Sequence, residues 1–359
     1  MPKLLLVTNH SRAAALGGRG LLSRLHRNAM QDIFGDDLVV LELISKPISG
    51  ALVAVRSFLG EIDGIDRASV TKLFDLISTH KINQVFIDGS NLGEVARLIK
   101  RHFPMIQIVT FFHNVEARFF LGAMRQERSV RALAILLANY LAERKAVRYS
   151  DKIVSLSERD SQLLGSLYGR CATHCAPMAL HDQFADSELL AIPNTKFILF
   201  VGSAFYANQA GIIWYAKEVA PRLKIKTYVV GHGLEKLNAS LELSGSIEVV
   251  GSVPSLTHWY QQAHVVVAPI FDGSGMKTKV AEALMYGKRV IGTPEAFSGY
   301  QEIMPAAGVV CRTAEEFVSA LQHSLDKPFC AMDGQLRALY EKHYSFAAAR
   351  SRLQKILES

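Results

Sequence analysis

Short apolar runs alternate with longer amphipathic stretches along most of this 359-residue chain. Segments such as "KLLLVT" (3–8), "QVFID" (84–88) and "HVVVAPI" (264–270) are almost wholly apolar, which is typical of strands that are covered on both faces of a sheet. The stretches between them are long enough for helices. The alternation therefore predicts parallel strands joined by crossover helices, the α/β class.

This alternation occurs twice along the chain, with a polar connection between the two halves. A chain of 359 residues with 49% hydrophobic residues exceeds the usual size of one domain. We predict two doubly wound domains, over 1–180 and 195–340, and a helix over 341–359 that is free to pack back on the first domain. Strands are expected at 3–8, 38–43, 84–88, 106–112, 152–157, 172–178, 196–202, 226–231, 247–251, 264–270, 289–293 and 308–311.

The charge of the chain favours an anionic partner. The net charge is +7 and the sequence pI is about 9.2, which suits a phosphorylated small molecule, nucleic acid or an acidic membrane. Basic residues are spread over the chain and form no strip interleaved with aromatic residues, so we expect no nucleic-acid partner.

The sequence also indicates a compartment. Four cysteines are too few for a disulfide framework in a chain of this length, which favours a reducing cytoplasm. The start, "MPKLLLVTNHSR", has the pattern of a strand and not that of a signal peptide. The run "ALAILLANYLA" (132–142) falls short of the roughly 20 apolar residues that cross a bilayer. We expect a cytoplasmic protein.

The segment "FDGSGMKTKVAEALMYGKRVIGT" (271–293) has the features of an anion site. Gly273 and Gly275 let backbone amides approach a ligand, and a helix is expected to start near Met276, with its positive dipole end toward that ligand. Lys277 and Lys279 lie in the first turns of this helix and add charge. The segment therefore predicts a phosphate-binding loop.

Glu282 follows about two turns later on the same predicted helix. The helical period places Val280 and Leu284 toward the sheet and Glu282 on another face, at a suitable distance to bind a ribose. In the alternative interpretation the glycines are ordinary turn residues, and Glu282 pairs with a solvated Lys279 at i, i+3. The residues alone leave both interpretations open.

Several segments resemble the family-four glycosyltransferases. One branch of that family has the motif formed here by Gly273, Gly275, Lys279, Glu282 and Ala283, and "YGKRVIGT" (286–293) continues it. "FVGSAFYANQAGIIWYAKEVAPRL" (200–223) also matches, with Gly202 ending a strand and Asn208 placed to cap a helix; "FFHNVEARFF" and "VSLSERD" match more loosely. The resemblance implies the GT-B fold, in which two Rossmann-like domains face each other across a ligand cleft.

The resemblance implies a nucleotide-sugar donor, with UDP or GDP as its nucleotide, and no cofactor. The ribose would bind Glu282 and the sugar would bind His113, and these two residues with Lys279 would form the catalytic group. The remaining donor-site residues would be Gly17, Gly18 and Arg19 of "LGGRG" (16–20), then Gly202, Asp272, Gly273, Ser274, Gly275, Met276 and Lys277.

Two positions depart from the family pattern. The loop after "FVG" lacks the basic pair that many members use for the diphosphate, so Lys277, Lys279 or Arg19 would replace it. Ser274 stands where many members have an acidic residue, and Asp272 is the nearest acidic substitute.

We expect no metal at the site. Cys171, His174 and Cys175 offer only three ligands and have no fourth at zinc-finger spacing. In the GT-B architecture, helix amides and basic side chains neutralise the leaving diphosphate in place of a divalent ion.

A basic stretch follows His113. A single helix is predicted from about 118 to 148, and a basic amphipathic surface of this kind suits anionic lipid equally as well as it suits a core helix with solvated arginines. Glu116 is expected to cap the start of this helix, in preference to contacting an acceptor. The basic residues are Arg118, Arg125, Arg128, Arg131, Arg144, Lys145 and Arg148.

The sequence thus predicts a glycosyltransferase that moves a sugar from a nucleoside diphosphate to an acceptor hydroxyl, with retention at the anomeric carbon. A glycan or lipid-linked acceptor suits a role in bacterial surface polysaccharide or glycoconjugate assembly, at the inner face of the plasma membrane. Two alternatives stay open: a non-hydrolysing sugar-nucleotide 2-epimerase of the same architecture, and a nucleotide-sugar-binding protein with a degraded site.

Overall fold

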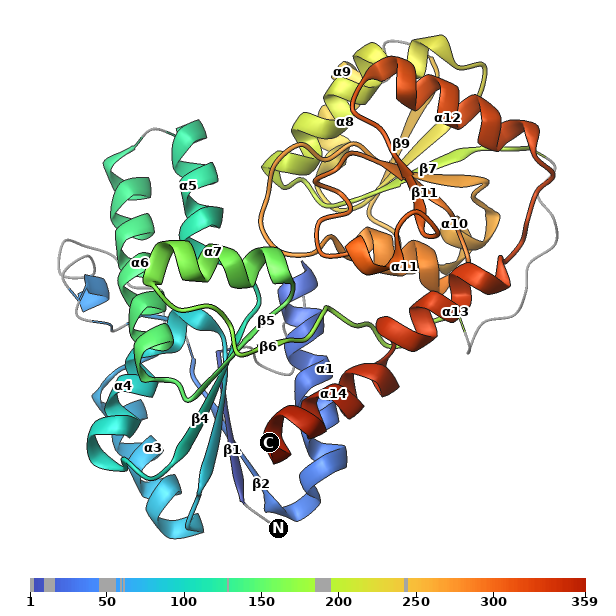
Figure 1. Cartoon of the computed structure of the whole chain (residues 1–359). Helices are drawn as coiled ribbons and strands as arrows, with labels where there is room; N and C mark the ends of the chain where they lie inside the picture. Colours follow the sequence, from blue (N-terminus) through green and yellow to red (C-terminus); the bar gives the residue numbers. More distant parts are fainter. Residues whose placement is uncertain are drawn as a thin grey trace. The chain divides into compact units, whose positions relative to one another are not determined.

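The chain forms two compact units in the computed structural model (Figure 1). One unit comprises Met1–Met178 with Ala349–Ser359, and the other comprises Ala179–Ala348. The structure describes residues 3–9, 17–44, 56–58, 60, 62–127, 129–184, 195–241 and 245–359. Leu16, Arg128 and most of the predicted inter-domain connection lie outside these ranges.

The first unit is built on a parallel sheet of six strands in the order β2-β1-β3-β4-β5-β6. All six predicted strands are present: β1 (Leu4–Thr8), β2 (Leu38–Glu42), β3 (Gln84–Asp88), β4 (Gln107–Phe112), β5 (Lys152–Ser155) and β6 (His174–Cys175). Every residue of β1 and β3 is buried, as their apolar sequences predict for strands covered on both faces. Its helices are α1 (Gly17–Phe34), α3 (Arg67–His80), α4 (Gly93–His102), α5 (Glu116–Glu127), α6 (Val130–Tyr149), α7 (Glu158–Tyr168) and α14 (Phe346–Glu358).

Helix α14 belongs to the first unit although it ends the chain. The Gln84 amide donates to the carbonyl of Leu357 (2.9 Å), and the Lys152 ammonium donates to that of Ile356 (2.7 Å). A cation at the carboxyl end of a helix satisfies carbonyls that have no partner within the helix and interacts well with its dipole. The last turn of α14 is thus fixed to the starts of β3 and β5.

The second unit also has a six-stranded parallel sheet, in the order β12-β11-β10-β7-β8-β9. Its strands are β7 (Ile198–Val201), β8 (Thr227–Val230), β9 (Ile247–Gly251), β10 (Val265–Ala268), β11 (Val290–Gly292) and β12 (Gly308–Val310), and each corresponds to a predicted strand. Its helices are α8 (Tyr206–Glu218), α9 (Asn238–Leu241), α10 (Thr257–Gln262), α11 (Thr278–Met285), α12 (Ala314–Asp326) and α13 (Gly334–His343). The predicted α/β class, with a doubly wound sheet in each half, is confirmed.

Each sheet reverses its winding direction once. In the first sheet β1 lies between β2 and β3, and in the second sheet β7 lies between β8 and β10. The chain leaves the first strand of each sheet toward one edge and later returns to continue toward the other. Ligands bind at the carboxyl ends of the two strands that flank such a switch point, which are β1 with β3 and β7 with β10.

The predicted single helix over 118–148 is wrong: the chain forms two packed helices, α5 and α6. Ser129 has an extended backbone and its hydroxyl accepts a hydrogen bond from the Ala132 amide (3.1 Å), so a new helix starts there. Glu116 was expected to cap the predicted helix, but it is the first residue of α5. Its own amide donates to the Glu143 carboxylate (2.8 Å), as does the amide of Ala117 (3.0 Å).

No helix among the described residues is sufficiently long and apolar to cross a membrane.

Gly211 is the position at which α8 packs against the chain that follows β10. A Cβ atom there would lie 1.8 Å from the carbonyl oxygen of Pro269, so the backbone would have to shift. We expect Gly211→Ala to lower the free energy of unfolding by about 1–3 kcal/mol despite the better helix propensity of alanine, measured by urea denaturation. Gly334→Ala is the control, because no atom lies within 4 Å of its added Cβ; equal stability of the two variants would contradict the packing argument.

Candidate functional site

A glycine-containing loop connects β10 to α11. Gly273 and Gly275 have φ angles of 137° and 64°, in the region that side chains disfavour. The Gly273 amide donates to the Asp272 carboxylate (2.8 Å). Ser274 is half-buried and Met276 is buried in the same loop. The loop therefore presents backbone at the carboxyl end of β10, as the sequence predicts.

Helix α11 begins at Thr278, two residues after Met276, near which its start is predicted. Lys277 is its N-cap residue, with an extended backbone and no side-chain capping hydrogen bond. The Tyr300 hydroxyl donates to the Lys277 carbonyl (2.8 Å), which stabilises the extended conformation. The Lys277 ammonium donates back to the Gly275 carbonyl (2.9 Å) and to Glu295 (2.8 Å), so it closes the loop on itself.

Lys279 is buried, so it is not the solvated residue of the alternative interpretation. Its ammonium donates to the Asn208 side-chain oxygen (2.8 Å) and lies 4.5 Å from the centre of the Phe200 ring. Burial lowers the pKa of Lys279 to about 7, with Glu282 opposing this shift and Lys277 adding to it. A buried ammonium with one neutral amide acceptor is suited to receive an anion.

Asn208 does not cap α8 as expected, because the N-cap residue is Phe205. The Asn208 amide nitrogen instead donates to the Ser203 carbonyl (2.9 Å), while its oxygen accepts from Lys279. A Cβ atom at Gly202 would lie 2.9 Å from the Asn208 side chain, so glycine allows this close approach. Asn208, on α8, thus connects the loop after β7 to Lys279 on α11 at the switch point of the second sheet.

Glu282 is half-buried and has a partner that the sequence did not reveal. The Tyr260 hydroxyl donates to its carboxylate (2.7 Å), and the Tyr260 ring stacks on Tyr286 at 5.1 Å. Burial raises the pKa of Glu282. Lys279 interacts with Glu282 electrostatically, but the hydrogen bonds of the two residues go to Asn208 and Tyr260. Tyr260 lies on α10, 22 residues before Glu282 in the sequence, so no local sequence pattern reveals this contact.

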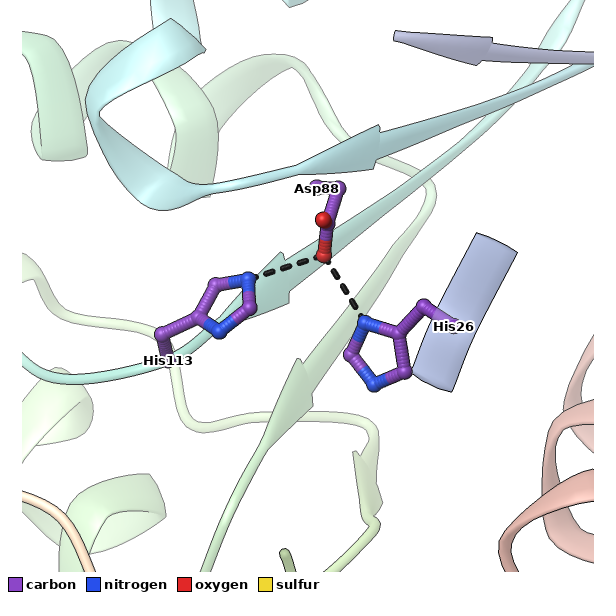
Figure 2. Close-up of side chains that lie close together, drawn as sticks. All are labelled: His26, Asp88 and His113. Carbon is purple, nitrogen blue, oxygen red and sulfur yellow. Dashed lines mark hydrogen bonds and ion pairs between the residues drawn. The ribbon is translucent and has the colours of Figure 1, made fainter. Parts of the chain in front are cut away.

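In the first unit, His113 follows β4 and contacts Asp88 at the end of β3 (Figure 2). Its Nε2 atom lies 2.8 Å from Asp88 Oδ1, and the Nδ1 atom of His26 lies 2.8 Å from the same oxygen. All three side chains are buried. Sequence analysis found His113 and missed Asp88 and His26. The signal for Asp88 was its place at the carboxyl end of a buried strand.

The glycine pair Gly17 and Gly18 opens α1, and Arg19 follows it. The Arg19 guanidinium donates to the Asn91 side-chain oxygen (2.8 Å) and lies 3.4 Å from Glu116. Burial raises the pKa of Glu116, and Arg19 counteracts this. Arg19 therefore has anionic and amide partners within its own unit, and a contact with a diphosphate stays a prediction.

The Glu282 carboxylate is the acceptor for the hydroxyl of Tyr260, a buried residue. We expect Glu282→Ala to lower the free energy of unfolding by about 1–3 kcal/mol, because the buried Tyr260 hydroxyl loses its acceptor. Glu282→Gln retains an acceptor oxygen and serves as the matched control. Adding Tyr260→Phe to Glu282→Ala should recover part of the loss in a double-mutant cycle; strict additivity would show that the two residues act independently.

Sequence comparison identifies a family within the second unit. Residues 195–327 match the model of the family described as glycosyl transferases group 1. This stretch includes Gly202, Asn208, the loop 269–277 and Glu282. The predicted resemblance to glycosyl transferases group 1 is confirmed. A comparison with curated protein sequences finds no match.

Solved structures with the same fold span nearly the whole chain. Sucrose-phosphate synthase from Thermosynechococcus elongatus is 15% identical with a TM-score of 0.73, covering 99% of this chain and 98% of its own. Anabaena Alr3699/HepE in complex with UDP and glucose is 12% identical with a TM-score of 0.69 and full coverage of both chains. WaaG, a glycosyltransferase involved in lipopolysaccharide biosynthesis, is 14% identical with a TM-score of 0.60, covering 97% and 94%. The predicted GT-B fold is confirmed.

Proposed function

We propose that this glycosyltransferase, which carries a glycosyl transferases group 1 domain over residues 195–327, moves a sugar from a nucleoside diphosphate to an acceptor hydroxyl with retention at the anomeric carbon. One observation carries the proposal. At the switch point of the second sheet, the loop after β7 is connected through Asn208 to Lys279 of α11, the helix that follows the glycine-containing loop. A buried cation beside a helix N-terminus is suited to a diphosphate.

The residues have distinct roles in this proposal. Gly273, Ser274 and Gly275 approach the diphosphate through the backbone, and Lys277 and Lys279 supply positive charge. Glu282 accepts hydrogen bonds from the ribose, and Tyr260 holds its carboxylate in place. His113 contacts the sugar. The lysines and the amides at the start of α11 stabilise charge on the departing diphosphate, so the reaction needs no resident metal and no enzyme nucleophile.

UDP is the nucleotide that we favour. Alr3699/HepE was solved with UDP, with UDP and glucose and with UDP-glucose, and it shares the fold of this chain. A thermal-shift screen of UDP, GDP and their sugars tests the choice. A nucleotide at 100 times its dissociation constant adds about 2.7 kcal/mol of stability, and no shift with any nucleoside diphosphate would contradict the proposal.

The requirement for an acceptor distinguishes this proposal from its two alternatives, an epimerase and a binding protein. Turnover that needs an acceptor and survives excess chelator supports metal-independent transfer. Interconversion of two nucleotide sugars without an acceptor would identify an epimerase, and tight UDP binding without turnover would identify a binding protein.

The low pKa of Lys279 predicts a pH-dependent affinity for UDP. In the free protein Lys279 loses its proton near pH 7, whereas a bound diphosphate favours the charged form. The affinity for UDP should therefore fall as pH rises above about 7, and binding at pH 8 should take up protons. Calorimetry in two buffers of different ionisation enthalpy measures this uptake. Lys279→Arg keeps its charge at these pH values, so the variant should show little uptake; equal uptake by both proteins would exclude Lys279 as its source.

The surface of the hairpin formed by α5 and α6 supports a peripheral membrane location. Four apolar side chains on α6 are exposed: Val130 (86%), Leu133 (45%), Ile135 (37%) and Leu137 (44%). Arg125 and Arg131 are exposed beside them in sequence. Basic residues next to exposed apolar ones suit the surface of an anionic bilayer. We propose a lipid-linked or glycan acceptor in bacterial surface polysaccharide or glycoconjugate assembly at the inner face of the plasma membrane.

Replacing Arg125 and Arg131 together by glutamine should weaken binding to vesicles of anionic phospholipid. Each basic residue near such a surface contributes about 1 kcal/mol, so the double variant should bind roughly 30-fold more weakly in a sedimentation assay. Arg312 and Lys342 are exposed basic residues of the second unit, and their replacement by glutamine is the control for net charge. Equal weakening by both pairs would remove the hairpin from the interaction.

A further inference from the structure

We propose that Asp88, together with His26, is the positioning element of the first unit, which fixes both the tautomer and the ring orientation of His113. The identification of the group that His113 contacts as a sugar hydroxyl rests on the proposed function. The positioning itself does not depend on it, since it follows from contacts within the first unit.

Two imidazole nitrogens share a single acceptor atom of Asp88. His26 Nδ1 and His113 Nε2 each lie 2.8 Å from Oδ1 of Asp88. The second carboxylate oxygen, Oδ2, accepts a longer hydrogen bond from the Thr8 hydroxyl (3.4 Å). An ionised carboxylate has no proton to donate, so each facing ring nitrogen must carry one.

The charge states of Asp88 and His113 follow from their burial and from the hydrogen bonds among Asp88, His113 and His26. Burial alone would raise the pKa of Asp88. The positive charge of His113 and His26 where they are protonated, and the hydrogen bonds that they donate, outweigh burial and hold this pKa well below its usual value. Burial lowers the pKa of His113 to about 4, against the opposing effect of Asp88. At neutral pH, Asp88 is therefore ionised and His113 is neutral. The single proton of His113 is on Nε2, and Nδ1 carries the lone pair.

Aromatic packing fixes the ring planes as well. The His26 ring meets the Phe111 ring edge to face at 4.2 Å, and the Phe111 ring meets the His113 ring at 5.3 Å with a 62° angle. These contacts stop either imidazole from turning over without opening the core. Only 1% of Asp88, 2% of His26 and 4% of His113 is exposed, so water does not compete for the carboxylate.

The fold brings these residues together at the switch point of the first sheet. Thr8 and Asp88 end the adjacent strands β1 and β3 in register. His26 comes from α1, the helix that follows β1, and His113 follows β4, the neighbour of β3 on its other side. Asp88 thus accepts hydrogen bonds from both histidines. It lies at the edge where a doubly wound sheet binds its ligand.

The alternative for this cluster is a metal site. Among the described residues, only His26, Asp88 and His113 place three ligand atoms of this kind within 4.8 Å of one another. A metal would need a lone pair on each facing nitrogen, whereas hydrogen bonding to Asp88 needs a proton there. The two assignments therefore predict opposite protonation of His113 Nε2, which an experiment distinguishes.

The first measurement uses the parent protein and needs no variant. With ¹⁵N-labelled histidine, long-range ¹H–¹⁵N correlation spectra report which ring nitrogen carries the proton, and His113→Gln assigns the signals. We expect His113 protonated at Nε2 alone at pH 7, before and after treatment with chelator. A proton on Nδ1, a doubly protonated ring, or zinc binding that removes the Nε2 proton would overturn the proposal.

The second measurement tests the consequence for turnover. Asp88→Asn keeps the shape but removes the negative charge at the oxygen that both histidines share. The hydrogen bond from His113 weakens, so we expect His113 to become a mixture of tautomers and kcat/KM for the donor sugar to fall about 10- to 100-fold. Thr8→Val removes the 3.4 Å contact to Oδ2 and leaves Oδ1 with its two histidines, so it should retain the tautomer. Unchanged kcat/KM in a folded Asp88→Asn protein with altered tautomers would show that His113 positioning is irrelevant to catalysis.

UDP binding separates this inference from the proposed function. The nucleotide contacts are assigned to the second unit, so Asp88→Asn should bind UDP as the parent does. Failure of the parent to bind any nucleoside diphosphate would contradict the proposed function and leave the tautomer result standing.

Discussion

The buried ammonium of Lys279 is the interaction on which the second unit's site depends. Placing a lysine in the core is costly unless a partner compensates it, and the partner here is one neutral amide oxygen of Asn208. Asn208 can serve only because its own nitrogen is fixed to Ser203 and because Gly202 leaves room for its side chain. The loop after β7 contains no basic residue, yet it takes part in the charge arrangement, because its Ser203 carbonyl fixes the asparagine that holds a lysine of α11.

The two switch points divide the chemistry in a consistent way. At the second sheet the donors are backbone amides and lysines, which suit a phosphate. At the first sheet a single carboxylate orients two imidazoles, which suits the recognition of hydroxyl groups. Each set lies at the carboxyl ends of adjacent parallel strands, the edge at which doubly wound sheets bind their ligands. The same topology therefore places groups of opposite character at the two switch points.

The sequence predicted the fold better than it predicted the contacts of the site. Strands buried on both faces are continuous apolar runs, so all twelve expected strands are present. The break between α5 and α6 was missed because the polar stretch "RQERSVR" (125–131) contains no glycine or proline, and only the Ser129 cap marks it. Glu282 and Lys279 lie on the helix that was expected, but their partners Tyr260 and Asn208 are distant in sequence. Helical periodicity tells which face a residue occupies, not which neighbour covers that face.

The partners of Asp88 also could not be predicted from the sequence. Its position at the end of β3 was visible in the sequence, but its importance comes from His26 on α1 and His113 after β4, which only the strand order brings together.

The partners of Glu282 also connect it to the chain that enters the second unit. Tyr260 holds Glu282 and stacks on Tyr286, which meets Phe184 edge to face at 5.8 Å. Arg337 lies over Phe184, donates to Asp182 and donates to the carbonyl of Met285, the last residue of α11. The helix that carries Lys279 and Glu282 is therefore fixed at its far end to the segment 179–184. A change in the position of α11 on nucleotide binding would have to be accommodated by these packed rings or transmitted to that segment. Because packed aromatic contacts have little compressibility, transmission is the physically simpler outcome.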